Sequence, residues 1–547
     1  MSVETRVRLP VLKHKDAADL DTLLSMPSRP MMIPELPRIS VDATESTPYR
    51  TSSYTIVVDL PDRPDELLLL HGYTGAYDRV SRRVAAYVRS LVAHRVPLPL
   101  YGDWSSESPY QTEPVLPPSD ETVARLRKRG YLTQMTKQQE ESYFAQIAAT
   151  LHQASLRQRP SFVLMPTYQC NLRCSYCFQD HMRTQPEYQH LLGTMTQEMV
   201  DRVFLGMAQI EVAHGLPVGT PGRSITLFGG EPLLRENRPI IEYILRKARE
   251  VDTSQISAIS NATDLDAYED LLGPQGIRMV QITLDGPPDE HDLRRIYADG
   301  SGSFARIVDN ISMALGRGTS VSLRINVDHH NIVRLPELAE LFQRKGWTEN
   351  PNFEAYAATL HIENGKAGSD ATLGSKQLQQ FLAEQSQQHQ AVRSLKCDDH
   401  SMTAQARQLF EQRQDPLSRF KTSFCGAHDT MYVIDSFGDI YACWERTGDP
   451  SLRIGAINAS GAVYMNSEHL RQWRGRNVSS NPVCRQCRYA AYCGGGCAVQ
   501  AEEAHGSLSS NYCDGFAKRF RASVVAAFSE YAQGDQTTLA VNRHCGL

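Results

Sequence analysis

Several features that would assign this chain to a familiar class of protein are missing from it. No apolar run is long enough to cross a bilayer, so we expect no membrane-spanning segment and no membrane partner. The first twenty residues, MSVETRVRLPVLKHKDAADL, lack the apolar core of a secretory signal. Lys and Arg (57 residues) do not exceed Asp and Glu (62 residues), and the net charge of −5 does not indicate a nucleic-acid partner. These absences predict a cytoplasmic protein.

Cysteine, in contrast, is plentiful, with twelve in the 547 residues. Structural disulfides are not expected in a reducing cytosol. Three cysteines lie close together, and the others begin more than two hundred residues later, at Cys397, Cys425, Cys443, Cys484, Cys487, Cys493, Cys497, Cys513 and Cys545. Such clusters with short gaps favour metal or cluster ligation over core packing.

The length predicts three to four domains of about 150 residues each. Residues 1–50 are rich in Pro, Asp and Ser and predict an irregular arm. Residues 51–157 predict a winged-helix-like α+β domain. Its strands are expected at 54–60 and 66–72 and its helices at 79–95, 121–133 and 137–153.

Residues 158–390 alternate strand and helix patterns, and strands are predicted at 161–167, 224–230, 256–262, 279–286, 321–328 and 353–359. This alternation predicts an α/β fold with a parallel sheet in the form of a partial (β/α)6 TIM-like barrel. Active sites of such barrels lie where the strands end, and polar or special residues fall there: Cys170, Gly229, Ser260, Asp285 and Asn326. A Gln-rich segment at 375–392 predicts a helix or a linker. A cysteine-rich domain is expected at 391–520 and a helix with a tail at 521–547.

The first cysteine motif, CNLRCSYCF, has the spacing CxxxCxxC just after a predicted strand and contains Cys170, Cys174 and Cys177. Three thiolates on one tight loop can hold three irons of a 4Fe–4S cluster and leave the fourth iron open to a substrate or cofactor. We therefore predict that these three cysteines form the catalytic metal site. The alternative is a zinc ion with a distant fourth ligand, but this is not a usual zinc spacing.

This motif closely resembles the cysteine loop of the radical S-adenosylmethionine (SAM) superfamily, and Tyr176 matches the aromatic position of that loop. The resemblance implies that the open iron binds the amino and carboxylate groups of SAM. It also implies that one electron cleaves the sulfonium and that the resulting 5′-deoxyadenosyl radical removes a hydrogen atom from a substrate carbon.

Further segments resemble motifs of the same superfamily that bind the cofactor. FGGEP (228–232) resembles the GGE motif, in which Gly229 and Gly230 let the backbone approach a ligand and Glu231 would pair with the methionine ammonium. Taken alone, GGEP is often just a turn. ISNAT (259–263) resembles a strand-end motif that would place Ser260 and Asn261 near SAM, although Ala262 replaces the usual glycine.

ITLDGPPDEHDLRR (282–295) is similar to a stretch typical of SPASM-type radical SAM enzymes. There, Thr283 and Arg295 would match positions that contact SAM, and Arg324 in LRINVD would meet the SAM carboxylate. The alternative for each arginine is a surface ion pair.

The second cysteine region resembles the seven-cysteine SPASM signature. The resemblance implies an outer auxiliary cluster on Cys484, Cys487, Cys493 and Cys513 and an inner one on Cys425, Cys443 and Cys497, which gives three 4Fe–4S clusters in all. The inner set lacks a fourth cysteine. Either its iron is open, or Cys397 or Cys545 reaches it. These two cysteines can equally be plain buried thiols, or one can donate a hydrogen atom to a substrate radical.

SPASM-type enzymes act on polypeptides, which makes a peptide the expected substrate. Sulfatase maturases carry an Asp directly after the second SPASM cysteine, whereas Trp444 follows Cys443 here. This difference argues against sulfatase maturation, and the alternative is that Glu445 substitutes for the Asp as the base. Many maturases of ribosomally made peptides begin with a winged-helix element that binds a leader peptide by strand addition, and residues 51–157 resemble it in pattern. The alternative for this domain is a structural cap on the barrel.

We therefore predict an enzyme that modifies a precursor peptide with a leader sequence through hydrogen abstraction, giving a crosslink, an epimer or a related oxidation. A flavodoxin or ferredoxin is the expected electron donor. One alternative is a sulfatase-type maturase that forms formylglycine. Another is a non-catalytic Fe–S electron carrier, which would not cleave SAM.

Overall fold

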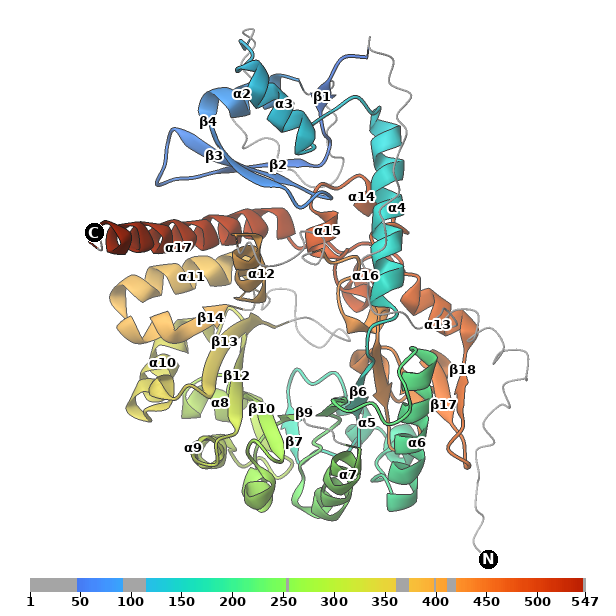
Figure 1. Cartoon of the computed structure of the whole chain (residues 1–547). Helices are drawn as coiled ribbons and strands as arrows, with labels where there is room; N and C mark the ends of the chain where they lie inside the picture. The colour runs from blue at the N-terminus through green and yellow to red at the C-terminus, as the bar shows by residue number, and fades with distance from the viewer. Residues whose placement is uncertain are drawn as a thin grey trace, which may run out of the picture. The chain divides into compact units, whose positions relative to one another are not determined.

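A computed structural model describes residues 47–91, 115–251, 255–360, 373–397, 400–410 and 420–544 (Figure 1). The chain divides into two compact units. Within the described ranges, unit 1 contains residues from 156–398 and 429–474, and unit 2 contains residues from 47–155, 399–428 and 475–544. The predicted cysteine-rich domain therefore contributes residues to both units.

Unit 1 is built on one large, mostly parallel sheet. Six strands that follow one another in sequence are also neighbours in space and are all parallel: β6 (Ser161–Leu164), β8 (Ser224–Leu227), β9 (Gln255–Ser260), β10 (Ile277–Thr283), β12 (Ser320–Val327) and β13 (Phe353–Thr359). Helices α6 (Gln197–Ala213), α7 (Arg238–Glu250), α9 (Phe304–Gly316) and α10 (Leu335–Arg344) connect four of the five successive strand pairs, and a 3-10 helix (Leu265–Leu271) connects β9 to β10. The predicted (β/α)6 arrangement is confirmed.

The sheet continues beyond the six strands on both sides. Strand β14 (Leu395–Cys397) joins β13 at one edge, and β15 (Met431–Ile434) joins β6 at the other. An antiparallel meander follows through β16 (Asp439–Tyr441), β17 (Gly455–Ile457) and β18 (Val463–Met465). Across the described residues the strand order runs from β14 to β18 without returning, so the barrel is open. The Gln-rich segment contains a helix, α11 (Ser375–Gln388).

The apolar spacing of the sequence explains these elements. In α9 the buried apolar residues recur three or four apart, from Phe304 and Ile307 to Ile311 and Leu315, which turns one face of the helix towards the sheet.

No described helix is both long and apolar enough to be a candidate membrane span.

Unit 2 begins with an antiparallel sheet of β2 (Thr55–Asp59), β3 (Glu66–His71) and β4 (Tyr77–Ser81), followed by helices α2 (Arg82–Ser90), α3 (Asp120–Lys128) and α4 (Lys137–Ser155). A short pair, β1 (Arg50–Thr51) with β5 (Leu132–Thr133), completes this α+β part. The predicted start of the helix over 79–95 is wrong. Residues 77–81 pair with β3, and the Ser81 side chain caps α2 by accepting from the Val84 N–H.

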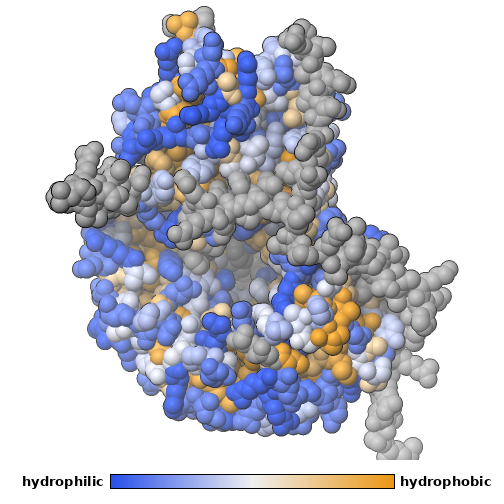
Figure 2. Space-filling view, viewed as in Figure 1, coloured by the Kyte–Doolittle hydropathy of each residue, from blue (hydrophilic) through white to orange (hydrophobic). Residues whose placement is uncertain are grey.

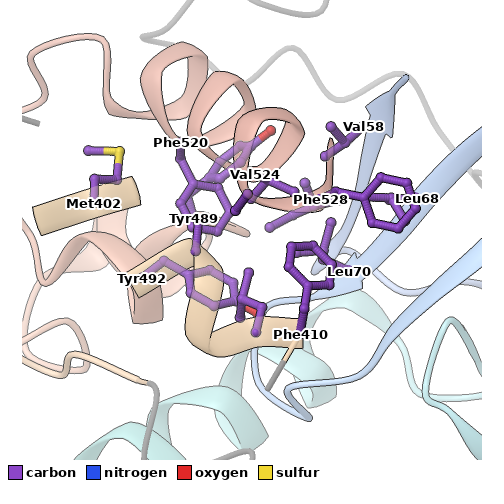
Figure 3. Packing of buried hydrophobic residues seen from close by; sticks show 14 of the residues in the cluster. Val58, Leu68, Leu70, Met402, Phe410, Tyr489, Tyr492, Phe520, Val524 and Phe528 are labelled. Carbon is purple, nitrogen blue, oxygen red and sulfur yellow. The ribbon is translucent and has the colours of Figure 1, made fainter. Parts of the chain in front are cut away.

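One hydrophobic core in unit 2 joins segments that are far apart in the sequence (Figure 3). Residues of β2 and β3 pack with α12 (His400–Phe410), α15 (Ala490–Cys493) and α17 (Phe516–His544). Tyr492 and Phe520 stack with ring centroids 4.6 Å apart, and Phe520 is fully buried. The sheet of β2–β4 and the C-terminal cysteine-rich segment therefore stabilise each other.

Replacing Phe520 by Ala is expected to lower the free energy of unfolding of unit 2 by about 3–5 kcal/mol, because the change leaves a cavity in this shared core. Ala526→Gln, at an exposed position of the same helix, is the control and should change stability by less than about 0.5 kcal/mol. Urea denaturation measures both. Equal effects of the two changes would show that this core does not hold the unit together.

Candidate functional site

The carboxyl ends of neighbouring strands in unit 1 bring the predicted site residues together. The loop after β8 is bonded to the segment that leads into the cysteine motif: the Gly230 N–H donates to Thr167 O (3.1 Å) and the Glu231 N–H to Gln169 O (2.7 Å). A Cβ at Gly230 would lie 2.2 Å from Gln169 O, and Gly229 has a φ of +140°. Both glycines are therefore required by this close approach.

Glu231 links the GGE motif to the end of β9. Its Oε1 accepts from the Leu233 N–H (2.9 Å) and the Ser260 hydroxyl (2.8 Å), and its Oε2 accepts from the Asn261 N–H (2.6 Å). Burial raises the pKa of Glu231 to about 7, although these three hydrogen bonds act in the opposite direction. A cationic group at Oε2 would favour the ionised form, as the predicted ammonium partner requires.

Asn261 extends the link to the cysteine loop. Its side-chain N–H donates to Asn171 Oδ1 (2.9 Å) and lies 3.7 Å from Cys170 Sγ. Ala262, at the position of the usual glycine, has a φ of +62° and is the one non-glycine residue with positive φ among those described. This conformation costs roughly 1–2 kcal/mol. Asn310 on α9 holds it by donating to Ala262 O (2.7 Å). Asn310 was not predicted from the sequence, where its signal is a polar residue on an apolar helix face.

Tyr176 joins the cysteine loop to two further strand ends. Its hydroxyl donates to Asp285 Oδ2, after β10, and accepts from Asn326 Nδ2 on β12 (3.0 Å) and from Arg295 (2.8 Å). Short strands β7 (Leu172–Cys174) and β11 (Arg295–Tyr297) pair antiparallel and place Arg295 opposite Cys174. Tyr176 therefore positions the loop, and its hydroxyl already has protein partners.

The two other predicted SAM contacts lie side by side on these strands. Thr283 and Arg324 are paired in register on β10 and β12, and both are half-buried. Arg324 Nε donates to Asn326 Oδ1 (2.8 Å), and Asn326 in turn contacts Tyr176. Arg324 therefore belongs to the polar network at the strand ends and not to a surface ion pair.

A buried arginine that the sequence analysis missed also faces the cysteine loop. Arg183, on the short helix α5 (Asp180–Thr184), donates to Cys177 Sγ (3.1 Å), and its Nε is buried without a hydrogen-bond partner. Desolvation raises the pKa of Cys170 to about 12 and that of Cys174 to about 11, and the guanidinium groups of Arg183 and Arg295 oppose this rise. A single arginine on such a short helix gives no signal in the sequence.

The donor set fits a cluster better than a single ion. Among the described residues, no three His, Cys, Asp or Glu side chains converge on one metal position. In a 4Fe–4S cluster each thiolate binds a different iron, so the thiols need not converge. An anionic cluster is stabilised by N–H groups that point at its sulfur ligands and by cations beside its thiols, and both are present here. These observations give no support to the zinc alternative.

In unit 2, Cys484, Cys487, Cys493 and Cys513 lie close enough to influence one another's charge. Burial raises the pKa of Cys484 to about 12 and that of Cys487 to about 11, and Asn511 Nδ2 donates to Cys513 Sγ (3.3 Å). Like the first cysteine loop, this set combines buried thiols with an N–H donor to one sulfur, which fits the outer cluster.

The remaining predicted ligands are distributed over both units. Cys425 and Cys497 belong to unit 2, whereas Cys443 belongs to unit 1. Cys397 ends β14 and is half-buried, and Cys545 lies outside the described residues. Trp444, which stands where sulfatase maturases have an Asp, packs against Phe228 beside the GGE motif, with ring centroids 5.6 Å apart.

Glu231 gives a pH-dependent stability. Between pH 4.5 and about 7 the unfolded chain ionises this carboxyl while the folded protein retains the proton, so the unfolding free energy falls as the pH rises. The difference between the two pKa values corresponds to a fall of roughly 3 kcal/mol in the unfolding free energy. We expect the stability of the SAM-free protein relative to Glu231→Gln to fall by this amount between pH 4 and pH 8, as measured by urea denaturation. If the unfolding free energies of the two proteins changed in parallel with pH, Glu231 would not have a raised pKa in the folded protein.

Comparisons with known proteins agree with this geometry. Residues 164–342 match the family model of the Radical SAM superfamily. The GTP 3′,8-cyclases of Rhizobium leguminosarum bv. trifolii and Caulobacter vibrioides are each 27% identical over 184 residues, which cover 33% of this chain and 47% of theirs. The chain therefore matches about half the length of these curated relatives.

Two solved structures are also similar. "Native anSMEcpe with bound AdoMet and Cp18Cys peptide" gives a TM-score of 0.46 at 17% identity and covers 70% of this chain and 100% of that one. Streptococcus suis SuiB bound to precursor peptide SuiA gives a TM-score of 0.44 at 13% identity and covers 85% and 98%. From the family match and the strand-end geometry, residues 164–342 of this chain are a radical SAM domain.

Proposed function

We propose that this chain is a SPASM-type radical SAM enzyme that modifies a ribosomally made precursor peptide by hydrogen abstraction. The observation that carries the proposal is the polar network that joins the cysteine loop, the GGE motif and the end of β9 through Glu231 and Asn261. Such a network holds several SAM-contacting groups in fixed positions before the cofactor arrives, as efficient catalysis requires.

The residues of this network would bind the cluster and the two charged groups of the methionine part of SAM. Cys170, Cys174 and Cys177 would hold a 4Fe–4S cluster, which supplies the electron that cleaves SAM. Oε2 of Glu231 has one protein donor and is the acceptor available to the methionine ammonium. Arg295, which has a buried Nε without a hydrogen-bond partner, would contact SAM, and Arg324 would meet the SAM carboxylate.

The peptide part of the proposal rests on the outer edge of β4 in unit 2, at Arg79. On each edge strand of this sheet an arginine binds one outward carbonyl, and on β2 it is Arg488, which donates to Thr55 O (2.7 Å). Hydrogen bonding alternates along β4, and the Tyr77 carbonyl, which accepts from Arg129 (2.7 Å), lies on its outer edge. The N–H and C=O groups of Arg79 therefore also point outwards, and no strand of the described residues pairs with them.

An extended leader peptide can pair with this edge by backbone hydrogen bonds. Arg79 and Ser81 are exposed, and the visible surface over α2 and β4 is mostly hydrophilic (Figure 2). The role of Trp444 agrees with a substrate other than a sulfatase, because an indole packed on Phe228 cannot act as the base that an Asp provides there.

The test is anaerobic co-expression, in heavy water, with candidate precursor peptides encoded beside this gene. We expect either a loss of two hydrogens, from crosslinking or desaturation, or a gain of one deuterium, from epimerisation. Mass spectrometry of the peptide distinguishes these outcomes. Unchanged peptides despite SAM cleavage would contradict peptide maturation and favour a folded-protein substrate, for which formylglycine formation is the next test.

Arg79→Pro tests the recognition edge through the affinity of the purified enzyme for the precursor peptide that the co-expression identifies. Proline removes an outward N–H, is tolerated at a sheet edge and should weaken binding of the peptide roughly five- to tenfold. Arg79→Ala loses the same side chain but keeps the N–H, so it should bind like the wild type. Equal affinities of the Pro and Ala variants would show that the leader does not pair with β4.

A further inference from the structure

Arg476 is a buried cation in unit 2 that the proposed reaction does not use. It lies between α13 (Ser467–Arg474) and α14 (Pro482–Arg485) and is 6% exposed. Its guanidinium donates to Gly496 O (2.9 Å), Gly495 O (3.2 Å) and Ser510 O (2.8 Å). The first two carbonyls lie between Cys493 and Cys497 in the sequence, so Arg476 is bound directly to the cysteine-bearing loops.

The surroundings of this guanidinium are thiols and carbonyls. Its charge interacts with four cysteines from both predicted auxiliary sets: Cys484, Cys497, Cys425 and Cys493. Its Nε is buried with no hydrogen-bond partner. Its Nη1 lies 3.4 Å from Nε2 of His428, which is also buried.

Two other buried arginines of this protein have carboxylate partners. Arg223 pairs with Glu211 (2.6 Å), and Arg453 pairs with Asp439 (2.8 Å). Among the described residues no such ion pair is formed by Arg476. A buried cation without a counter-charge costs several kcal/mol, so its retention indicates an anionic partner.

We propose that Arg476 is a positioning residue whose charge is shared by the two auxiliary cysteine sets and raises the reduction potentials of the clusters they bind. A thiolate-bound cluster is anionic and becomes more so when it accepts one electron, so a nearby cation favours the reduced form. This inference rests on the proposed function, because it takes these cysteines as cluster ligands.

The experiment uses the full chain with Cys170, Cys174 and Cys177 replaced by Ala, so that only auxiliary clusters remain. Arg476→Gln keeps hydrogen-bond donors but loses the charge, and Arg476→Lys keeps the charge. Arg407→Gln removes a charge from the same unit that is already paired at an exposed position, with Glu530 at 2.6 Å, and is the matched control. Iron content and the midpoint potentials of the reduced-cluster EPR signals are measured during titration with dithionite.

We expect Arg476→Gln to shift the auxiliary potentials to more negative values or to lose auxiliary iron, whereas Arg476→Lys and Arg407→Gln stay close to the parent. Full iron content with unchanged potentials in Arg476→Gln would overturn the inference. Equal loss of iron in the Gln and Lys variants would overturn it too, since the hydrogen bonds and not the charge would then matter. A parent that binds no auxiliary iron overturns both this inference and the auxiliary clusters, while SAM cleavage by the intact chain still tests the remaining proposal.

Discussion

The site depends most on one buried carboxylate. Glu231 accepts hydrogen bonds from Ser260 and Asn261 at the end of β9, and its own N–H donates to the segment that leads into the cysteine loop. Three stretches of chain that are far apart in sequence are thereby fixed at one edge of the parallel sheet. Because the carboxylate is buried, each of these hydrogen bonds is stronger than it would be in water, and the loss of any one would leave a polar group unsatisfied.

The same physical arrangement recurs at each cysteine set. Buried thiols are costly to ionise, and the protein places guanidinium groups and N–H donors beside them, with Arg183 and Arg295 at the first loop and Arg476 in unit 2. Burial raises the pKa of Cys170 and Cys484 to about 12 and that of Cys174 and Cys487 to about 11, so metal binding by these four thiols must release their protons. The cost of burying the arginines is offset when an anionic group occupies the site.

Most of the fold and of the site that could be predicted from the sequence was predicted from short-range patterns. Apolar, β-branched runs identified the parallel strands, and the cysteine and glycine spacings identified the loops, because each depends on residues within one turn or one strand. The predicted start of the helix over 79–95 was wrong because the residues before Ser81 fit both a helix and a strand. Pairing with β3 makes them a strand. The contacts of Arg183, Asn310 and Arg476 could not be predicted, since each joins a single polar residue to a distant segment. The core that β2 and β3 share with α17 is long-range in the same way.

The central claim is that the strand ends of unit 1 form one SAM-cleaving site. It is tested most directly by chromatographic measurement of 5′-deoxyadenosine after anaerobic reconstitution with iron and sulfide and addition of SAM and dithionite. We predict that the wild type and Cys397→Ala form it and that Cys174→Ala does not. Formation at the wild-type level by Cys174→Ala, or none from a wild type with its iron sites filled, would contradict the account.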